Sequence, residues 1–180
     1  CNQKSIFFLD WTKTLNFSLK IETQNYLLLR GPWDVVVCCE VLEHLDKPEM
    51  ALQSVKELTR PGSRLIITVP GGPIADVDRA FGHRRHYQKK DLRNFLESEG
   101  FIVDRIQACG FPFFNIYRFG LVVMGKRVLD TINKMNVAKP SFAKVASLRI
   151  VGSLFRLNLN KLPFGWQLIC ECRVTWTFNF

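Results

Sequence analysis

Hydrophobic and polar positions follow two different patterns in the middle of the chain. Residues 33–39 (WDVVVCC) and 64–70 (RLIITVP) are almost continuously apolar, which is typical of strands buried on both faces of a parallel sheet. Residues 46–60 and 88–100 instead repeat apolar residues at helical spacing, with Pro48 suited to a first helical turn and Gly100 to a helix end. A further strand follows at 101–110. This order of elements predicts an α/β fold with a mainly parallel sheet.

The two ends of the chain are less regular. Residues 5–10 form a short apolar run that ends in Asp10, and residues 17–29 alternate roughly as a strand does. After Gly110 an aromatic segment leads into a stretch with helical character, and residues 165–180 alternate again and predict a late strand. We see no internal repeat and no domain linker, so we expect a single domain over residues 1–180.

The composition is that of a globular protein and narrows the choice of partners. The 180 residues are 47% hydrophobic and carry a formal net charge of +9, which favours anionic partners. The basic residues are spread widely, however, so a solvated surface explains them as well as a nucleic-acid groove does. The six cysteines form no C-x-x-C pair and are interpreted as small buried residues in a reducing compartment. Without a signal peptide or an apolar run of membrane-spanning length, we expect a cytoplasmic location.

Acidic and imidazole side chains gather where the first apolar strand ends. The stretch VVVCCEVLEHL places Glu40, Glu43 and His44 directly after the strand, and open parallel sheets bind ligands beyond the carboxyl ends of their strands. In a helical turn these three side chains share one face. With His83 or His86 added, the set suits Mg²⁺, Mn²⁺ or Fe²⁺. Alternatively, Glu43 and His44 hydrogen-bond the loop backbone and only fix the turn.

Three stretches together resemble one enzyme family. Residues 33–70 (WDVVVCCEVLEHLDKPEMALQSVKELTRPGSRLIITVP), the GHRRHY stretch at 82–87 and the closing FGWQLICECRV are similar to class I S-adenosylmethionine-dependent methyltransferases. Ser63 stands where the family usually has the second glycine of a PGG turn. The resemblance implies a Rossmann-like, mainly parallel sheet with helices on both faces and a late antiparallel strand, and S-adenosylmethionine as cofactor.

The resemblance also assigns cofactor-binding residues. Residues 6–10 resemble the second strand of the family, so Asp10 would accept hydrogen bonds from the cofactor ribose, with an N-cap of the following segment as the alternative. Thr23 and Gln24 would lie near the adenine, and Cys39 and Glu40 beside the methionine portion. No glycine precedes Gly31, so the glycine-rich turn that follows the family's first strand is missing. We therefore expect an N-terminally incomplete domain without its first strand and that turn.

Several residues are candidates for the chemistry of methyl transfer. His44, His86 and Glu43 are candidate catalytic groups, because a base helps to deprotonate an oxygen or nitrogen acceptor. Some relatives, namely ubiquinone-pathway O-methyltransferases and small-RNA terminal 2′-O-methyltransferases, hold a divalent metal with residues of this kind. The matching set here is Glu40, Glu43, His44 and His86, with Mg²⁺ or Mn²⁺ as the metal.

The acceptor side is predicted less sharply. His83, Arg84, Arg85 and Tyr87 could cover an anionic or hydroxylated acceptor, or Tyr87 could pack inward with the arginines solvated. The aromatic segment 111–119 could wall the acceptor pocket, form core or contact a membrane peripherally. We expect methyl transfer, preferably to oxygen, on a small-molecule, lipid or sugar acceptor. The alternatives are a non-catalytic methyltransferase-like subunit and an RNA-directed methyltransferase, although no RNA-binding signature supports a nucleic-acid partner.

Overall fold

The structure, a computed structural model, describes residues 6–10, 32–134, 152–159 and 162–175. Five strands, four named helices and a short helical stretch at residues 152–155 lie within these ranges. In chain order the strands and named helices are β1 (Ile6–Asp10), β2 (Trp33–Cys39), α2 (Pro48–Glu57), β3 (Thr59–Pro70), α3 (Asp76–Ala80), α4 (Lys89–Ser98), β4 (Phe101–Cys109), α5 (Phe113–Lys134) and β5 (Gln167–Val174).

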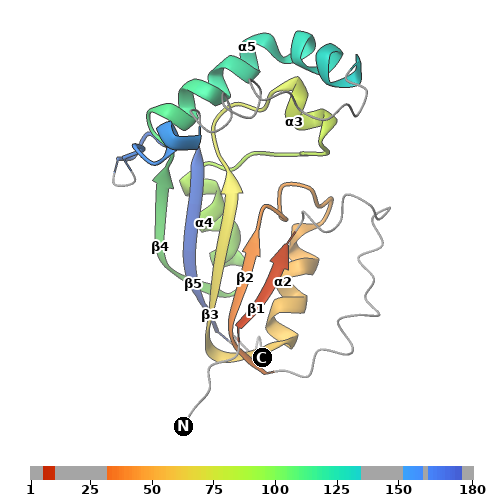
Figure 1. The fold of residues 1–180 in the computed structure, drawn as a ribbon. Helices are drawn as coiled ribbons and strands as arrows, with labels where there is room; N and C mark the ends of the chain where they lie inside the picture. Colours follow the sequence, from red (N-terminus) through yellow and green to blue (C-terminus); the bar gives the residue numbers. More distant parts are fainter. Residues whose placement is uncertain (1–5, 11–31, 135–151, 160–161, 176–180) are drawn as a thin grey trace.

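The strands form one sheet in the order β1-β2-β3-β5-β4 (Figure 1). β1 pairs with β2 and β2 with β3 in parallel, whereas β5 is antiparallel to both β3 and β4. The first four strands therefore run in one direction and only β5 opposes them. This confirms the predicted α/β class and the late antiparallel strand, whereas the sheet is mixed, with two parallel and two antiparallel strand pairings.

One face of the sheet carries the hydrophobic core. Val36 in β2 and Leu65 in β3 are fully buried, and the core that contains them also takes in Leu52 of α2 and Leu92 of α4. Both helices therefore cover the same face. Val37 and its neighbours on the other face are only half-buried, so burial alternates along β2 instead of being complete on both faces as the sequence predicted. Among the described residues no helix packs on that second face.

The strand β3 begins earlier than expected. Residues 61–63, the turn that follows the helical pattern of residues 46–60, lie inside β3, where Gly62 has a φ of +85°. Ser63, which replaces the glycine usual in the family, is buried and its hydroxyl donates to the carbonyl of Trp33 at 2.7 Å. This bond ties the start of β3 to the start of β2.

The first strand takes an unexpected position. β1 hydrogen-bonds directly to β2, with Asp10 level with Cys39. The family resemblance makes β2 the fourth strand, and in the usual doubly wound order the first strand, not the second, lies beside the fourth. Residues 6–10 thus stand in the first-strand position instead of the second-strand position assigned from the sequence. The predicted strand at 17–29 lies outside the described residues.

The remaining elements close the carboxyl edge of the sheet. Figure 1 shows α5 and α3 lying beyond the arrowheads of β3 and β4, away from α2. The five described cysteines are free thiols, as expected from their spacing. Within the described ranges no helix is long and apolar enough to span a membrane.

Candidate functional site

Glu40 is the first residue after β2 and has a left-handed backbone, with a φ of 52°. This conformation is uncommon for a residue with a side chain and often marks a functional position. Its N–H donates to the carbonyl of Thr68 at 2.9 Å. One carboxylate oxygen, Oε1, accepts from the Thr68 hydroxyl at 2.9 Å and from the Gln167 amide at 2.6 Å. Glu40 thus joins the ends of β2 and β3 to the start of β5.

A shallow, open cavity of about 480 Å³ lies above these strand ends. Its polar lining comes from Glu40, Thr68, Asn158 and Gln167, and its apolar lining includes Cys109, Phe114 and Ile169. The polar groups thus come from strand ends together with the 152–159 segment, whereas Phe114 belongs to α5. A ligand with an apolar body and several polar groups matches this lining.

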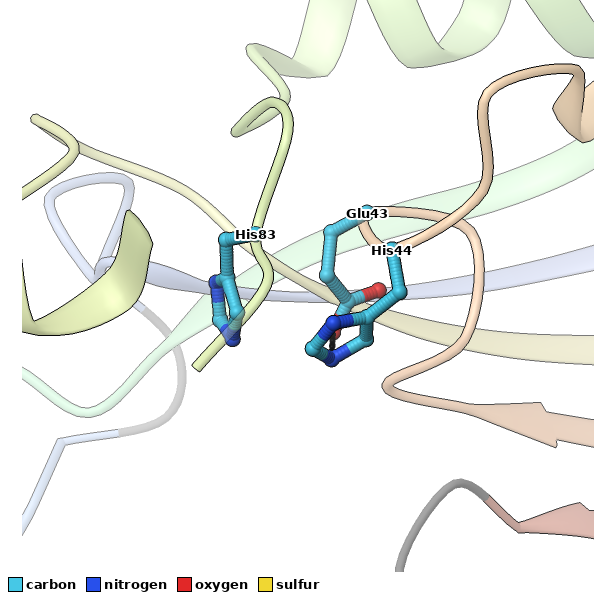
Figure 2. A group of neighbouring side chains, drawn as sticks. All are labelled: Glu43, His44 and His83. Atoms are coloured by element: carbon cyan, nitrogen blue, oxygen red, sulfur yellow. Dashed lines mark ion pairs between the residues drawn. The ribbon is translucent and has the colours of Figure 1, made fainter. Parts of the chain in front are cut away.

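Glu43, His44 and His83 converge beside this edge (Figure 2). Glu43 and His44 are 0% and 2% exposed, and Nε2 of His44 lies 3.8 Å from Oε1 of Glu43. The ring of His83 meets that of His44 edge-on, with centroids 4.6 Å apart. One possible ligand atom from each residue lies within 4.8 Å of the other two. One carboxylate and two imidazoles form a donor set suited to a divalent metal with open positions.

The Glu43 carboxyl group is buried without compensation. Neither of its oxygens has a hydrogen-bond partner within the part of the chain that the structure describes. Burial, followed by the nearby charge of Glu40, raises the pKa of Glu43 to about 8. Buried polar groups are nearly always paired, so this one is expected to serve a ligand.

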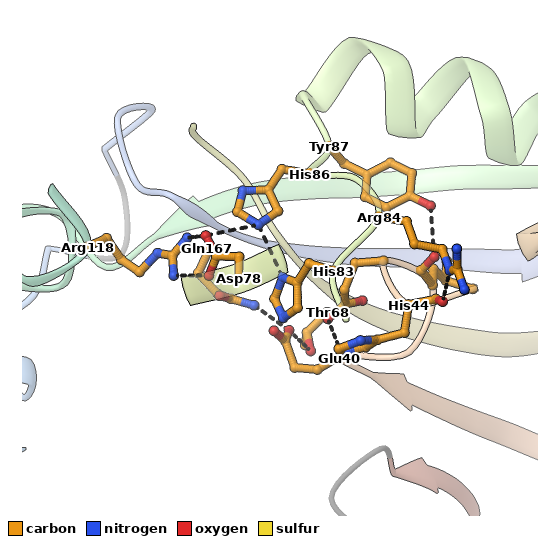
Figure 3. Close-up of polar contacts among 12 residues, drawn as sticks. Glu40, His44, Thr68, Asp78, His83, Arg84, His86, Tyr87, Arg118 and Gln167 are labelled. Carbon is orange, nitrogen blue, oxygen red and sulfur yellow. Dashed lines mark hydrogen bonds and ion pairs between the residues drawn. The ribbon is translucent and has the colours of Figure 1, made fainter. Parts of the chain in front are cut away.

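A chain of hydrogen bonds fixes the tautomers of two histidines (Figure 3). Nδ1 of His86 lies 3.2 Å from the carbonyl of Gly72, which can only accept, so Nδ1 carries the proton. Burial lowers the pKa of His86, so its ring is neutral and Nε2 accepts from Nδ1 of His83 at 3.2 Å. Burial, followed by the charge of His44, lowers the pKa of His83 to about 4. The lone pair of His83 is therefore on Nε2, on the side of Glu43 and His44.

This series of hydrogen bonds changes the roles expected of His83 and His86. Both ring nitrogens of His86 are engaged, so it has no nitrogen left to take a proton from a substrate. His83, which was predicted to bind substrate, has the available lone pair. Burial also lowers the pKa of His44, so that ring too is neutral near pH 7.

The series of polar contacts continues to Asp78 and Arg118, which the sequence did not single out strongly. Oδ2 of Asp78 lies 3.7 Å from Nε2 of His86, and both Asp78 oxygens accept from Arg118 of α5. Asp78 lies in the segment after β3, where the sequence makes it a weak candidate, whereas nothing in the sequence indicates Arg118. Thr68 and Gln167 were missed as well. Only their positions at or after strand ends could have indicated them.

Arg84 and Arg85 support the turn that contains His44. Nε of Arg84 donates to the carbonyl of His44 at 2.8 Å, and its guanidinium pairs with Asp46 at 2.6 Å. Arg85 donates to the carbonyls of Leu45 and Asp46, each at 3.0 Å. Both guanidinium groups thus bind the protein itself, although Arg84 is also exposed to solvent, as the alternative interpretation expected, and Arg85 is half-buried.

Tyr87 packs inward, as that alternative expected. It is 8% exposed, and its hydroxyl donates to the carbonyl of Leu42 at 3.3 Å. Its N–H donates to the carbonyl of Pro70 at 3.0 Å. Tyr87 therefore joins the loop before α4 to both strand ends.

The other predicted residues are placed as follows. Asp10 and Cys39 end neighbouring strands, whereas Thr23 and Gln24 lie outside the described residues. The predicted metal set is divided: Glu43 and His44 group with His83, and His86 groups instead with Asp78 and His83. Glu40, also in the predicted set, is hydrogen-bonded to Thr68 and Gln167.

The solved structures to which this chain is similar include the following three. An Archaeoglobus fulgidus SAM-dependent methyltransferase is 17% identical with a TM-score of 0.43, covering 83% of this chain and 63% of its own. Phosphoethanolamine N-methyltransferase 2 of Haemonchus contortus is 15% identical with a TM-score of 0.42, covering 80% and 34%. The [4+2]-cyclase SpnF is 14% identical with a TM-score of 0.46, covering 81% and 52%. The chain thus spans less than two thirds of each of these proteins.

Sequence comparison gives a closer relationship. A highly reducing polyketide synthase, azaB of Aspergillus niger, is 32% identical over 79 residues, which is 42% of this chain and 3% of that protein. The sequence profile of the family described as "Methyltransferase domain" matches residues 8–106. That match spans more than half of the chain and includes β2, α2, β3 and α4 with the polar residues between them. The chain therefore belongs to the methyltransferase domain family.

Proposed function

We propose that this chain transfers a methyl group from S-adenosylmethionine to an acceptor oxygen. The observation that carries the proposal is the cluster of Glu43, His44 and His83 beyond the carboxyl ends of β2 and β3, in a chain of the methyltransferase domain family. Open α/β sheets bind their ligands at this edge. The acceptor would be a small molecule, lipid or sugar that offers a hydroxyl group.

The residues at this edge fit the cofactor. S-adenosylmethionine supplies a methyl group on a positively charged sulfur, and carboxylates stabilise such a cation. Asp10 and Glu40 provide carboxylates at the ends of the neighbouring strands β1 and β2. We assign Asp10 and Cys39 to the cofactor side, together with Thr23 and Gln24.

Proton removal from the acceptor is assigned to His83. Its Nε2 carries a lone pair at neutral pH because His86 accepts the Nδ1 proton. A neutral imidazole takes a proton without prior ionisation. His86 then acts as a positioning residue that holds the tautomer of His83.

A divalent metal at Glu43, His44 and His83 is a second element of the proposal. The observation that favours it is the fully buried Glu43 carboxyl group without a hydrogen-bond partner among the described residues. Mg²⁺, Mn²⁺ or Fe²⁺ would satisfy that group and lower the pKa of a bound hydroxyl. His83 would then be a metal ligand, and the metal would replace it as the group that activates the acceptor.

Calorimetric titration with S-adenosylmethionine tests the proposal. We expect binding of the cofactor, weakened about tenfold in Asp10→Ala through loss of a charge-assisted hydrogen bond. Asp104→Ala, in an exposed ion pair on β4, is the matched control and should bind normally. Absence of binding would instead support a non-catalytic methyltransferase-like subunit.

Product formation distinguishes the remaining alternatives. S-adenosylhomocysteine release is measured with phenols, fatty acids, sugars and RNA as separate acceptor classes. Turnover only with RNA would favour the RNA-directed alternative. Loss of turnover with a chelator and its return with Mg²⁺ or Mn²⁺ would support the metal, and turnover unaffected by chelator would reject it.

A further inference from the structure

One side of α5 exposes apolar side chains. Ile116, Phe119 and Val123 are 65%, 58% and 68% exposed, and their spacing of three and four residues places them on one face of the helix. The opposite face is packed: Arg118 is buried against Asp78, and Gly125 lies close to Asp76 of α3. The helix therefore turns its apolar stripe away from the rest of the protein. An ordinary surface helix instead packs its apolar stripe against the core.

A second segment extends this apolar face. The ring of Phe155 packs edge-on against Phe114 and Tyr117 of α5, with centroids 5.8 and 5.7 Å apart. The Asn158 side chain accepts from the first N–H groups of α5. Further exposed apolar residues are Tyr117, Met124, Leu154, Leu157, Leu159 and Phe164. We call these six, with Ile116, Phe119 and Val123, the apolar face.

The same part of the chain holds almost all of the net charge. Residues 111–166 contain nine of the 25 Lys and Arg residues but only one of the 16 Asp and Glu residues, which gives +8 of the total +9. Arg127 and Arg156 are exposed, one on α5 and one beside Phe155. Of these nine, Arg118 is buried against Asp78 and four lie outside the described residues, so Arg127 and Arg156 are the exposed cations that the described part of the chain places beside the apolar side chains.

Exposed apolar side chains next to cations are complementary to the surface of an anionic bilayer. Contiguous exposed apolar surface marks interaction sites, and an amphipathic helix with basic residues binds the interface of acidic membranes. A second copy of the chain would bring two faces of equal positive charge together. RNA would be bound through phosphate contacts and aromatic stacking, whereas most of the exposed side chains here are aliphatic.

We propose that the apolar face docks on an anionic lipid bilayer, with α5 lying in the plane of the interface. Ile116, Phe119 and Val123 enter the acyl boundary, and the surrounding cations meet the lipid phosphates. This inference is independent of methyl transfer. It also places the cavity near the membrane, because Phe114 of α5 and Asn158 line that cavity.

Vesicle flotation tests the proposal with phosphatidylcholine vesicles, alone or mixed with phosphatidylglycerol. We expect binding to the mixed vesicles only, and a loss of binding near 1 M salt, where the Debye length is about 3 Å. The triple variant Ile116→Ser/Phe119→Ser/Val123→Ser should bind at least about 30-fold more weakly, since it loses three inserted apolar side chains. Arg127→Gln and Arg156→Gln should each weaken binding about fivefold.

Met50→Ser/Ile102→Ser is the matched control. These residues are 59% and 46% exposed but lie on α2 and β4, so vesicle binding should be unchanged. Circular dichroism verifies that each variant is folded. The proposal is overturned if wild type does not float with the mixed vesicles, if the triple variant binds as wild type does, or if the apolar face instead mediates a dimer or binds RNA in preference to lipid.

Discussion

The Arg118 guanidinium donates hydrogen bonds of 2.5 and 2.6 Å to the two carboxylate oxygens of Asp78. Asp78 is 3% exposed, and Arg118 is the cation that compensates its burial. Burial alone would raise the pKa of Asp78, but the bonds from Arg118 and from the Ala75 N–H outweigh it and hold the pKa below its ordinary value. The pair fixes α5 to α3 and sets the charge beside His86.

Arg118→Met should destabilise the protein by about 3–5 kcal/mol, because it leaves a buried carboxylate without its cation. Urea unfolding measures the change. Arg173→Met removes a similar bidentate pair with Asp104, but that pair is exposed and its loss should cost less than about 1 kcal/mol. Equal losses of unfolding free energy in the two variants would show that the Asp78–Arg118 pair contributes no more to stability than an exposed ion pair does.

Glu43→Gln should change how stability depends on pH. The folded pKa of Glu43, about 8, is above the value in the unfolded chain, so the folded state holds the proton more tightly. This contribution is complete below the unfolded pKa and is lost as pH rises through about 8. Wild type should therefore lose on the order of 2 kcal/mol relative to Glu43→Gln between about pH 5 and about pH 8.5.

Unfolding is measured with chelator present at both pH values. Glu57→Gln on the exposed side of α2 is the control and should track wild type at both. Parallel pH profiles for wild type and Glu43→Gln would contradict the raised pKa of Glu43.

Part of this site could be located from the rule that open parallel sheets bind ligands beyond the carboxyl ends of their strands. The rule placed Glu40, Glu43 and His44 correctly at the carboxyl edge, because an apolar run followed by acids shows where a buried strand ends. It could not distinguish His83 from His86, since the loop that carries them is not helical and periodicity gives no ring orientation. Arg118 was beyond reach, because its partner lies 40 residues away in the chain.

The sheet was predicted in the same partial way. Local pattern defined β2, β3, β4 and β5, but pairing between distant segments decides which strands are neighbours. Nothing within residues 6–10 indicates that they pair directly with β2. The exposed stripe of α5 was hidden for a related reason: its apolar residues suit a core as well as a surface, and only packing shows which face Arg118 occupies.

Tyr87→Phe should destabilise the protein by about 1 kcal/mol, because the buried carbonyl of Leu42 loses its hydrogen bond from the Tyr87 hydroxyl. The ring itself stays in the core, so no cavity forms. Chemical denaturation measures the loss, and Tyr117→Phe, at a half-exposed position of α5, should change stability by much less. A variant as stable as wild type would show that the Tyr87 hydroxyl does not support the turn before α2.

His86→Phe should change the tautomer of His83. In wild type, His86 accepts the proton of His83 Nδ1, so ¹⁵N NMR near neutral pH should show a neutral His83 ring protonated at Nδ1. Phenylalanine keeps a ring of similar size but offers no acceptor, so the Nε2–H tautomer should gain population and the Nδ1 resonance should move toward the unprotonated range. Arg85→Gln, which changes the neighbouring residue without touching either ring, should leave the spectrum of His83 unaltered. If wild-type His83 is already protonated at Nε2, its lone pair does not face Glu43, and neither the base nor the metal-ligand role assigned to that nitrogen can hold.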